Sequence, residues 1–529
     1  MPLWERTARA AECRAPAHRR RRRTAHLRAL LLGSPRPDGG EQAAALPAGQ
    51  RVTWLHATNL SGRPTRPWPR GIVFCLLLDS NLRLLPRLKQ LLRRPFVRNV
   101  GALATGTAAA QAISMAFAPV TTRLYGPEAY GVQGVFLSVA GIAATVAALT
   151  FPIAIVLPKS DMDARGLVKL SLFVSAGMST LVALLLFFFG RPLLALLNAE
   201  SIVGLAWLIP VYMLFSVLND TAGQWLIRRK AFRLSARISV SQALLAGGSK
   251  IGIGAILPSA KALIVINNLA LVLHAAMIAI GLRRRPLPPE SRKTRQAARR
   301  PNLWSLAKRH RDFPMLRAPQ VLLNSASRNL PSMMLAAFFG PAAVGFYAIA
   351  NTVLGIPTAL IGGAVGQVFY PRINEAAQTG EPVRKLILKA TLGLAAVGIV
   401  PYATIIVAGP WLFALVFGGD WATAGTYARW LSLQYLNRPA VAAVPVLELQ
   451  GGLLLYEVFS TGSKIAALAL GHFVWKSDIA AIALFSIAGV AAYAFLILWV
   501  IHHSGTVRRP LPPRAESKPE MSDDVAKAS

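Results

Sequence analysis

Apolar stretches of about 20 residues recur from residue 99 to residue 501, and each is long enough to cross the hydrocarbon core of a bilayer. Of the 529 residues, 54% are hydrophobic and only 15% are charged, whereas a soluble protein carries about a quarter charged residues. Backbone amides in lipid must be satisfied within their own segment, and the stretches lack the alternating pattern of a membrane β-barrel. The sequence therefore predicts an all-α polytopic membrane protein.

The apolar stretches divide into two groups of six. We predict about 12 transmembrane helices, with a first six-helix lobe over 99–282, a basic cytoplasmic linker over 283–316, a second lobe over 317–501 and a cytoplasmic tail over 502–529. The predicted helices are 99–119, 131–157, 167–189, 202–222, 237–257, 262–282, 317–337, 342–369, 387–408, 424–446, 452–473 and 478–501.

Residues 1–98 differ from the rest of the chain. They hold 19 Arg and one Lys against five acidic residues, and they have no sustained periodicity. Both cysteines, Cys13 and Cys75, lie here, so we expect no disulfide or thiolate metal site in the helices. One interpretation is a basic arm for lipid headgroups or RNA. The favoured one is a disordered or mis-annotated extension, with translation beginning near Leu88 to Asn99.

Lys and Arg in the predicted loops indicate the orientation. With the N-terminus inside, the inner loops carry 24 Lys and Arg residues, and the outer loops carry five. The outer five are Arg123, Arg191, Lys261, Arg429 and Lys476. The asymmetry predicts that both termini lie in the cytoplasm. It also accounts for most of the basic charge beyond residue 98, so the formal net charge of +36 does not point to nucleic acid as a partner.

Two short motifs recur at one separation. GSKI stands at 248–251 and at 462–465, and RLYGPEAYG (Arg123 to Gly131) matches AFFGPAAVG (Ala337 to Gly345), both pairs being 214 residues apart. Six is an even number, so the halves enter the membrane in the same sense, and we predict two parallel six-helix repeats around a central cavity. The turn residues are expected to serve turn geometry and helix initiation. They are Gly126, Pro127, Gly340 and Pro341.

Four cations fall within predicted helices. Lys250 and Lys464, of the two GSKI motifs, lie about a dozen residues into their helices, which at 1.5 Å per residue is about 18 Å deep. Arg328 lies near the middle of 317–337, and Arg438 lies within 424–446. A cation at that depth costs at least about 2.5–3.5 kcal/mol on insertion scales. A positive surplus that faces a water-filled cavity predicts a site for an anion.

Few carboxylates could neutralise these cations. Asp220, Glu448 and Glu457 are all predicted nearer the inner ends of their helices. Two alternatives stay open for each cation, since its side chain can reach the headgroups or pair locally. The Gly and Ser beside both lysines suit close helix packing, which favours an inward-facing position.

Motifs for catalysis are weak or missing, and we predict no enzyme, no cofactor and no metal site. GSK is not the GK[ST] of a phosphate-binding loop, so no ATP site is expected. Asp161-Met162-Asp163 has the DxD form of glycosyltransferases, but it lies in a short predicted loop, and an acidic pair opening a helix is the favoured interpretation. The chain has no HExxH and no GxSxG.

Four segments resemble those of a known family. They are RLYGPEAYG, RDFPMLRAPQVLLNSASRNLP (Arg311 to Pro331), ALIGGAVGQVFYPRINEAA (Ala359 to Ala377) and FGGDWATAGTYARWL (Phe417 to Leu431). Over about residues 95–505 the chain resembles the oligosaccharide flippases, or polysaccharide biosynthesis (O-antigen, Wzx-type) transporters. These belong to the multidrug/oligosaccharidyl-lipid/polysaccharide exporter (MOP) superfamily.

The resemblance implies a transporter that flips an undecaprenyl-pyrophosphate-linked oligosaccharide across the bacterial cytoplasmic membrane by alternating access, for O-antigen, exopolysaccharide or capsule biosynthesis. Deep cations fit the pyrophosphate. Polar groups on the first and seventh helices fit sugar hydroxyls, although hydrogen bonding between helices is the favoured explanation for any one of them. These groups are Thr105, Thr107, Gln111, Asn324 and Ser325. The predicted substrate-binding residues are Lys250, Lys464, Arg328, Arg438, Gln111 and Asn324.

The implied partners are the lipid-linked oligosaccharide, membrane lipids, and the polysaccharide polymerase and glycosyltransferases of the same pathway. Two alternatives stay open. A peptidoglycan-precursor flippase has a substrate with the same polyprenyl pyrophosphate. A multidrug-type exporter of the same superfamily shares the plan of helices, but cationic drugs would call for deep carboxylates rather than deep bases.

Overall fold

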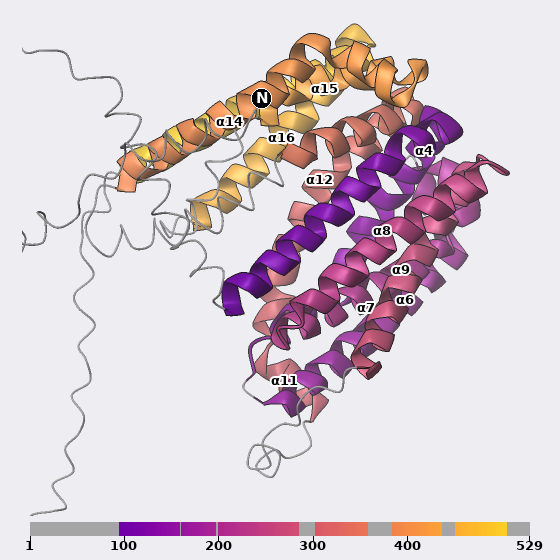
Figure 1. The fold of residues 1–529 in the computed structure, drawn as a ribbon, viewed down its shortest axis with the longest axis vertical. Helices are drawn as coiled ribbons and strands as arrows, with labels where there is room; N and C mark the ends of the chain where they lie inside the picture. Colours follow the sequence, from indigo (N-terminus) through magenta and orange to yellow (C-terminus); the bar gives the residue numbers. More distant parts are fainter. Residues whose placement is uncertain are drawn as a thin grey trace, which may run out of the picture. The chain divides into compact units, whose positions relative to one another are not determined.

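The described part of the chain is helical. The computed structural model describes residues 95–158, 160–196, 199–284, 302–357, 383–435 and 450–504, all within the unit Ser80–Ser529. Every regular element in these residues is a helix (Figure 1). Among them, five helices are long and apolar enough to cross a membrane. The spans are Leu103–Ala147, Asp161–Ala195, Ala260–Arg283, Gly398–Phe417 and Asp478–Trp499. The prediction of an α-helical polytopic membrane protein is confirmed.

The first half contains seven helical elements within the described residues. They are α4 (Pro95–Ala147), α5 (Phe151–Ala154), α6 (Asp161–Leu196), η1 (Glu200–Leu205), α7 (Leu208–Arg228), α8 (Phe232–Gly254) and α9 (Ala260–Arg284). Helix α8 packs along α4 (Figure 1). Glycines make this approach possible, because a Cβ atom on Gly247 would meet the Phe117 ring and one on Gly254 would meet the Tyr125 ring.

The second half begins with the linker helices. The described elements are α11 (Leu303–Arg309), η2 (Phe313–Arg317), α12 (Ala318–Phe339), the helix Pro341–Pro357, α14 (Val383–Phe417), η3 (Gly419–Trp421), α15 (Ala422–Tyr435), α16 (Gln450–Trp475) and α17 (Asp478–Ser504). Helices α14 and α15 touch through Gly409 and Gly425, whose backbones leave no room for a Cβ atom on either residue. Helix α11 was not predicted, and it packs on α6 through the buried Leu306.

Several predicted helix boundaries are wrong by up to ten residues. The predicted helix 131–157 ends at Ala147, and a turn with positive φ at Leu149 and Thr150 follows. The Thr150 hydroxyl donates to the Phe313 carbonyl at 3.0 Å, which holds this turn against the start of the second half. Helix α7 begins six residues later than predicted because the apolar residues before it form η1. Uniformly apolar sequence carries little information about where a helix ends.

The repeated turns have the predicted geometry. Gly126 has φ 69° and ψ 171°, and Gly340 has φ 83° and ψ 178°, a combination that is essentially confined to glycine. The helix Pro341–Pro357 begins directly after Gly340, and α4 is kinked at Gly126, directly before Pro127. The assignment of these residues to turn geometry and helix initiation is confirmed.

The two halves meet in a reciprocal contact beside these turns. A Cβ atom on Gly131 would overlap the carbonyl of Pro341, and a Cβ atom on Gly345 would overlap the carbonyl of Pro127. These four residues occupy matching positions in the two repeats, so the repeats are related by a local two-fold arrangement here. Among the described residues, a hydrophobic core continues through this contact, from Phe136 in the first half to Val344 in the second.

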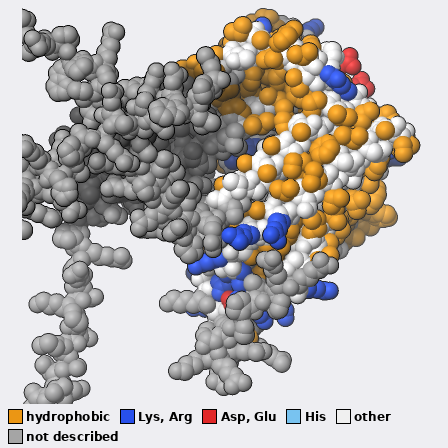
Figure 2. All heavy atoms as spheres, in the orientation of Figure 1, with side chains coloured by type: hydrophobic (Ala, Val, Ile, Leu, Met, Phe, Trp, Pro, Cys, Tyr) orange, Lys and Arg blue, Asp and Glu red, His pale blue; other side chains and the backbone are white. Residues whose placement is uncertain are grey.

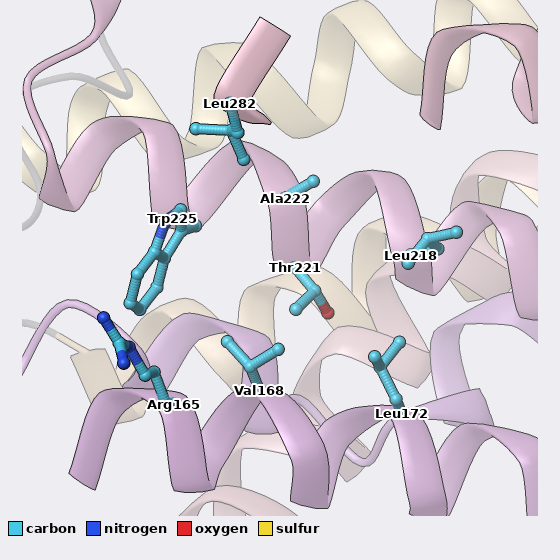
Figure 3. Close-up of a pocket in the computed structure, with 8 residues that line it drawn as sticks. All are labelled: Arg165, Val168, Leu172, Leu218, Thr221, Ala222, Trp225 and Leu282. Carbon is cyan, nitrogen blue, oxygen red and sulfur yellow. The ribbon is translucent and has the colours of Figure 1, made fainter. Parts of the chain in front are cut away.

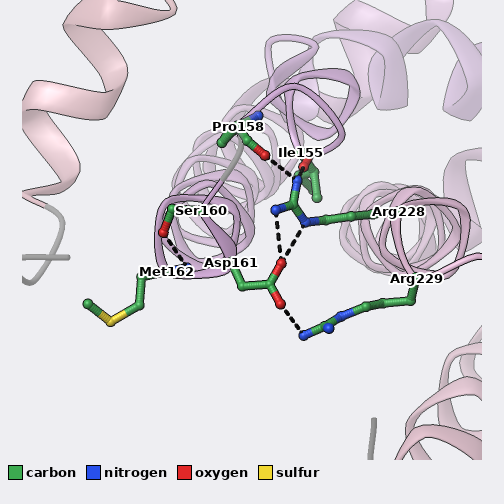
Figure 4. Close-up of polar contacts among 7 residues, drawn as sticks. All are labelled: Ile155, Pro158, Ser160, Asp161, Met162, Arg228 and Arg229. Carbon is green, nitrogen blue, oxygen red and sulfur yellow. Dashed lines mark hydrogen bonds and ion pairs between the residues drawn. The ribbon is translucent and has the colours of Figure 1, made fainter. Parts of the chain in front are cut away.

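An ion-pair cluster fixes the start of α6 to the end of α7 (Figure 4). Asp161 accepts from Arg228 at 2.9 Å and pairs with Arg229 at 2.5 Å. Arg228 also donates to the Pro158 carbonyl at 2.6 Å. Asp161 and Asp163 stand in the first turn of α6, as predicted, and we expect no metal at the DxD sequence. Within the described residues, no cluster of metal-ligand side chains is found.

The outer surface suits a lipid environment. Helix α6 exposes Phe173, Phe187 and Phe188 at 74%, 81% and 69% of their surface, and α14 exposes Val407 at 77%. Figure 2 shows hydrophobic side chains over much of the visible face of the described helices, with Lys and Arg gathered toward the end where α11 lies. Large exposed apolar surfaces on a folded bundle mark contact with lipid or another apolar partner.

Candidate functional site

A polar cavity of about 730 Å³ lies in the second half. It is enclosed by α12, the helix Pro341–Pro357, α15, α16 and α17. The lining residues that are charged or carry an amide are Asn324, Arg328, Asn351, Gln434, Glu457 and Lys464. Three predicted site residues, Arg328, Lys464 and Asn324, are therefore brought together.

One face of α12 supplies the first wall. Asn324, Ser327, Arg328, Pro331 and Ser332 all line the cavity. Their spacing of three and four residues places them on one side of a helix. Arg328 lies ten residues after the start of α12 and 11 before its end, which is about 15 Å from either end. A guanidinium group at this depth needs an aqueous or polar neighbourhood, and the cavity supplies one.

One face of α16 supplies a second wall, next to α12. Glu457, Thr461 and Lys464 follow one another at spacings of four and three residues. The Thr461 hydroxyl donates to Ser327 Oγ at 2.8 Å, and Asn324 Nδ2 donates to Glu457 Oε1 at 3.4 Å, so α16 and α12 are joined at two levels. Lys464 lies 14 residues after the start of α16 and 11 before its end, and its Nζ is 5.3 Å from the centre of the Tyr493 ring. A cation over an aromatic face is stabilised by the ring quadrupole.

Glu457 was predicted nearer the end of its helix than the deep cations, and it lies only seven residues after the start of α16. It lines the same cavity as Arg328 and Lys464. It stands two helical turns before Lys464, about 10 Å along α16. The charged lining residues among those described are thus two cations and one carboxylate. The positive surplus is smaller than predicted, but its sign is retained.

Lys250 has a different position from its counterpart Lys464. It lies 18 residues after the start of α8 and only four before its end, which is about 6 Å from the helix terminus. The predicted depth of about a dozen residues is therefore wrong, because α8 begins at Phe232 and ends at Gly254. The Lys250 carbonyl accepts from the Tyr125 hydroxyl at 2.8 Å. Lys250 is not among the residues that line the second-half cavity.

The polar residues predicted on α4 are exposed and lie toward its N-terminal end. Gln111, Thr105 and Thr107 are all exposed. Thr105 donates to the Gly101 carbonyl at 2.8 Å, and Thr107 donates to the Ala104 carbonyl at 3.0 Å, so both hydroxyls bond within their own helix. The favoured expectation for these residues was a hydrogen bond between helices. Neither of these two bonds is of that kind.

Ser325 and Arg438 complete the predicted set. Ser325 Oγ donates to the Gly141 carbonyl at 3.4 Å and therefore joins α12 to α4. Arg438 and Glu448 lie outside the described residues, and their predicted positions stay predictions. Asp220 is an exposed residue of α7 in the first half.

Sequence reasoning missed most of the other lining residues, among them Asn351, Gln434, Tyr435 and Tyr493. Tyr435 donates from its hydroxyl to Asn351 Oδ1 at 2.8 Å, which joins α15 to the helix Pro341–Pro357. Gln434 and Tyr493 line the cavity beside them. A polar side chain in an apolar helix is the only signal these residues give, and Asn351 and Gln434 carry it.

The cavity can bind an anion that also carries hydroxyl groups. Arg328 can offer a planar fork to phosphate oxygens, and Lys464 can offer a mobile point charge. Amide side chains of Asn324, Asn351 and Gln434 provide both donors and acceptors.

The fold is similar to that of a membrane transporter of known structure. A structure described as the inward-facing conformation of a multidrug resistance MATE family transporter of the MOP superfamily matches at TM-score 0.51 and 14% identity. The match covers 77% of this chain and 94% of that one. A MATE structure in complex with MaL6 matches at TM-score 0.49 and 15% identity, covering 77% and 96% of the two chains.

The family model described as polysaccharide biosynthesis protein matches residues 120–425. This chain belongs to that family, and the resemblance predicted from the four motifs is confirmed. No curated protein matches the chain.

Proposed function

We propose that the protein is a flippase that carries a polyprenyl-pyrophosphate-linked oligosaccharide across the bacterial cytoplasmic membrane. Two findings support this proposal at the level of class: membership of the polysaccharide biosynthesis family and a fold shared with MOP-superfamily transporters. The observation that carries the substrate assignment is the meeting of Arg328 and Lys464 in one polar cavity about halfway along two helices.

The substrate has three chemically different parts, and each has a place in the proposal. The pyrophosphate binds Arg328 and Lys464, because charge-assisted hydrogen bonds to phosphate are the strongest available here. Sugar hydroxyls bind Asn324, Asn351 and Gln434, which line the same cavity. The polyprenyl chain stays in lipid along the apolar outer surface of the helices. Glu457 accepts from Asn324 and limits the positive charge that an empty cavity would hold.

In this proposal, alternating access uses the contacts that join the two halves. At the end that bears the Gly126 and Gly340 turns, Arg123 donates to the Leu415 carbonyl at 2.8 Å, and Trp421 Nε1 donates to the Thr122 carbonyl at 3.2 Å. Toward the opposite end, α4 leaves Thr105, Thr107 and Gln111 exposed. We assign this state as closed at the turn end, and the opposite state requires these contacts to break.

The proposed orientation rests on charge. Lys and Arg gather toward the end where α11 lies (Figure 2), and we assign this end to the cytoplasm. The turns at Gly126 and Gly340 then face the outside, and the conformation is open to the inner leaflet. The oligosaccharide is assembled on the cytoplasmic side in this proposal, and it is released after the halves rock.

The test is export by cells that depend on this protein. The double variant Arg328→Gln and Lys464→Gln is expected to reduce surface polysaccharide by at least about tenfold, while the lipid-linked oligosaccharide accumulates inside. A tenfold reduction is the minimum, because the loss of even one charged hydrogen bond to phosphate costs about 1.5–3 kcal/mol and this variant removes two cations. Both quantities are measured by extraction and chromatography of the polysaccharide and of the lipid fraction.

Lys261→Gln is the matched control, because Lys261 is an exposed cation near the start of α9 that does not line the cavity. Its export is expected to equal that of the wild type. Undiminished export by the double variant, with normal amounts of protein in the membrane, would contradict the proposal. If the wild-type protein restores peptidoglycan-precursor flipping in cells that lack it, and does not restore polysaccharide export, the substrate must be reassigned.

A further inference from the structure

A second cavity lies in the first half, between α6, α7 and α9 (Figure 3). Its volume is about 240 Å³, and its lining residues are Arg165, Val168, Leu172, Leu218, Thr221, Ala222, Trp225 and Leu282. Six of these eight side chains are apolar, and Arg165 and Thr221 are the two exceptions. We propose that this cavity binds an anionic phospholipid of the surrounding bilayer, with phosphate at Arg165 and one acyl chain in the apolar part.

The lining residues fall into three levels along the helix axes. Figure 3 shows Arg165 and Trp225 at one end, Val168 and Thr221 in the middle, and Leu172 with Leu218 beyond them. From Arg165 to Leu172 is seven residues, which is about 10 Å along the helix. The cavity thus runs from a charged level through a level with a hydroxyl group to a purely apolar level. A phospholipid has matching regions in the same order, namely its phosphate, its ester groups and its acyl chains.

The charged level is close to the helix ends. Arg165 is the fifth residue of α6, Trp225 lies three residues before the end of α7, and Leu282 lies two residues before the end of α9. Trp is enriched where a helix passes from hydrocarbon to headgroups. Arg229 stacks on the Trp225 ring at 5.1 Å, which holds the indole at this level.

Charge complementarity favours an anionic occupant. Asp161, four residues before Arg165 on α6, pairs with Arg228 and Arg229. Asp163, two residues before Arg165, forms no ion pair with it. Within the described residues, Arg165 has no carboxylate partner, and it is exposed at the mouth of the cavity. Arg283 follows the lining residue Leu282 and is also exposed. A lipid phosphate at the mouth of the cavity would meet the Arg165 guanidinium group.

Thr221 points to the same occupant. It is only 3% exposed, and its hydroxyl has no hydrogen-bond partner within the described part of the chain. Figure 3 shows its side chain directed from α7 toward α6, across the cavity. A buried hydroxyl group without a partner is unfavourable. An ester or glycerol oxygen of a lipid, one turn below the phosphate, would accept its hydrogen bond.

The apolar part of the cavity contributes shape complementarity to lipid binding. It adds no hydrophobic driving force, because an acyl chain in the bilayer is already out of water. Selectivity must then come from Arg165 and the headgroup. We expect phosphatidylglycerol to bind about five- to tenfold more tightly than phosphatidylcholine, from roughly one charge interaction at the membrane surface.

The experiment is native mass spectrometry of the full-length protein in detergent, titrated with dioleoyl phosphatidylglycerol or dioleoyl phosphatidylcholine. Arg165→Gln is expected to bring the affinity ratio of the two lipids close to one. Lys169→Gln is the matched control, since Lys169 is an exposed cation one turn further along α6 that does not line the cavity. Its ratio should equal that of the wild type.

Two further variants test the deeper levels. Thr221→Val keeps the shape and removes the hydroxyl, and it should weaken both lipids about equally. Ala222→Phe should fill the cavity and abolish saturable binding, and its thermal unfolding midpoint shows whether it is folded. If Ala222→Phe does not fold, Thr221→Val alone tests this level.

Three results would overturn the proposal. Equal losses of the preference for phosphatidylglycerol in Arg165→Gln and Lys169→Gln would show that surface charge acts in general and that Arg165 has no specific role. Equal affinity of the wild type for the two lipids would remove the role of the anionic headgroup. Displacement of phosphatidylglycerol from the wild type by undecaprenyl phosphate at equal concentration would show that a polyprenyl carrier is the occupant. None of these outcomes depends on whether the second-half cavity transports oligosaccharide.

Discussion

The two GSKI motifs have the same sequence and different surroundings. In the second half, Lys464 lies well inside α16, beside a polar cavity that also contains Arg328 and Glu457. In the first half, Lys250 lies four residues from the end of α8, in a helix that packs tightly on α4. Repetition of a motif therefore did not preserve its chemical environment.

The neighbouring residues explain the difference. At the positions 214 residues before Thr461 and Pro331, the first half has Gly247 and Phe117. The Phe117 ring occupies the space where a Gly247 side chain would stand, so α4 and α8 close on one another. In the second half, Thr461 instead bonds to Ser327. The counterpart of Arg328 is Ser114, so the first half lacks the second cation as well.

The turns behave in the opposite way. Gly126 and Gly340 have nearly the same φ and ψ, and Gly131 and Gly345 make reciprocal contacts. Backbone conformation and close approach restrict the residue type at these positions, whereas a cavity wall accepts many side chains. We infer that the repeats share the backbone conformation of the turns and their packing, and that the proposed binding site lies in the second repeat.

The largest expected effect on stability comes from closing the space at the reciprocal contact. Gly131→Ala and Gly345→Ala would each press a methyl group against a backbone carbonyl, of Pro341 and Pro127 respectively. Overpacking of this kind costs about 1–3 kcal/mol, occasionally more. Chemical unfolding in detergent should show similar losses for the two variants.

The control for this pair is Gly177→Ala in α6, where a Cβ atom meets nothing within 4 Å. Alanine in a helix is favoured over glycine, so this variant should be neutral or more stable by up to about 1 kcal/mol. A large loss at Gly131 with none at Gly345 would break the two-fold relation between the halves.

A somewhat smaller effect is expected at the turns. Gly126→Ala and Gly340→Ala meet no atom within 4 Å, so only backbone strain acts. Residues forced into such φ and ψ values cost about 1–3 kcal/mol, and alanine at an uncrowded position should lie toward the lower end. The unfolding free energies of both variants and of the control Gly248→Ala check this. Wild-type stability in both turn variants would show that the turns tolerate ordinary residues.

The smallest effect concerns the hydrogen bond that distinguishes the second half. A double-mutant cycle with Thr461→Val and Ser327→Ala should give a coupling of about 0.6 kcal/mol, the average for such bonds in membrane helices. The readout is again the free energy of unfolding. Zero coupling would mean that packing alone holds the cavity walls together. The difference between Thr461 and its first-half counterpart Gly247 would then matter less than this account requires.

The sequence predicted the fold better than it predicted the site. Helix number, helix type and the glycine turns followed from apolar length and from residues with restricted backbones, such as Gly126 and Gly340. Helix ends were less accurate, because an apolar residue fits equally well before or after a boundary. That error of a few residues placed Lys250 too deep.

The composition of the cavity depends on tertiary structure. Arg328, Lys464 and Asn324 were predicted because charge or an amide inside an apolar helix is conspicuous. Glu457 was placed nearer the helix end than Lys464, as the structure has it, but its place in the same cavity was not predicted, and Asn351, Gln434, Tyr435 and Tyr493 were missed. To predict the cavity one must know which faces of five helices meet, and a helix period fixes a face only relative to its own helix.

The central claim is that a pyrophosphate group binds in the second half and not at the matching lysine of the first. The most direct measurement is the affinity of the purified full-length protein for undecaprenyl pyrophosphate, compared between Lys464→Gln and Lys250→Gln. We predict that Lys464→Gln weakens binding about tenfold or more and that Lys250→Gln leaves it close to that of the wild type. Equal weakening by both substitutions, or unchanged binding in Lys464→Gln, would contradict this account.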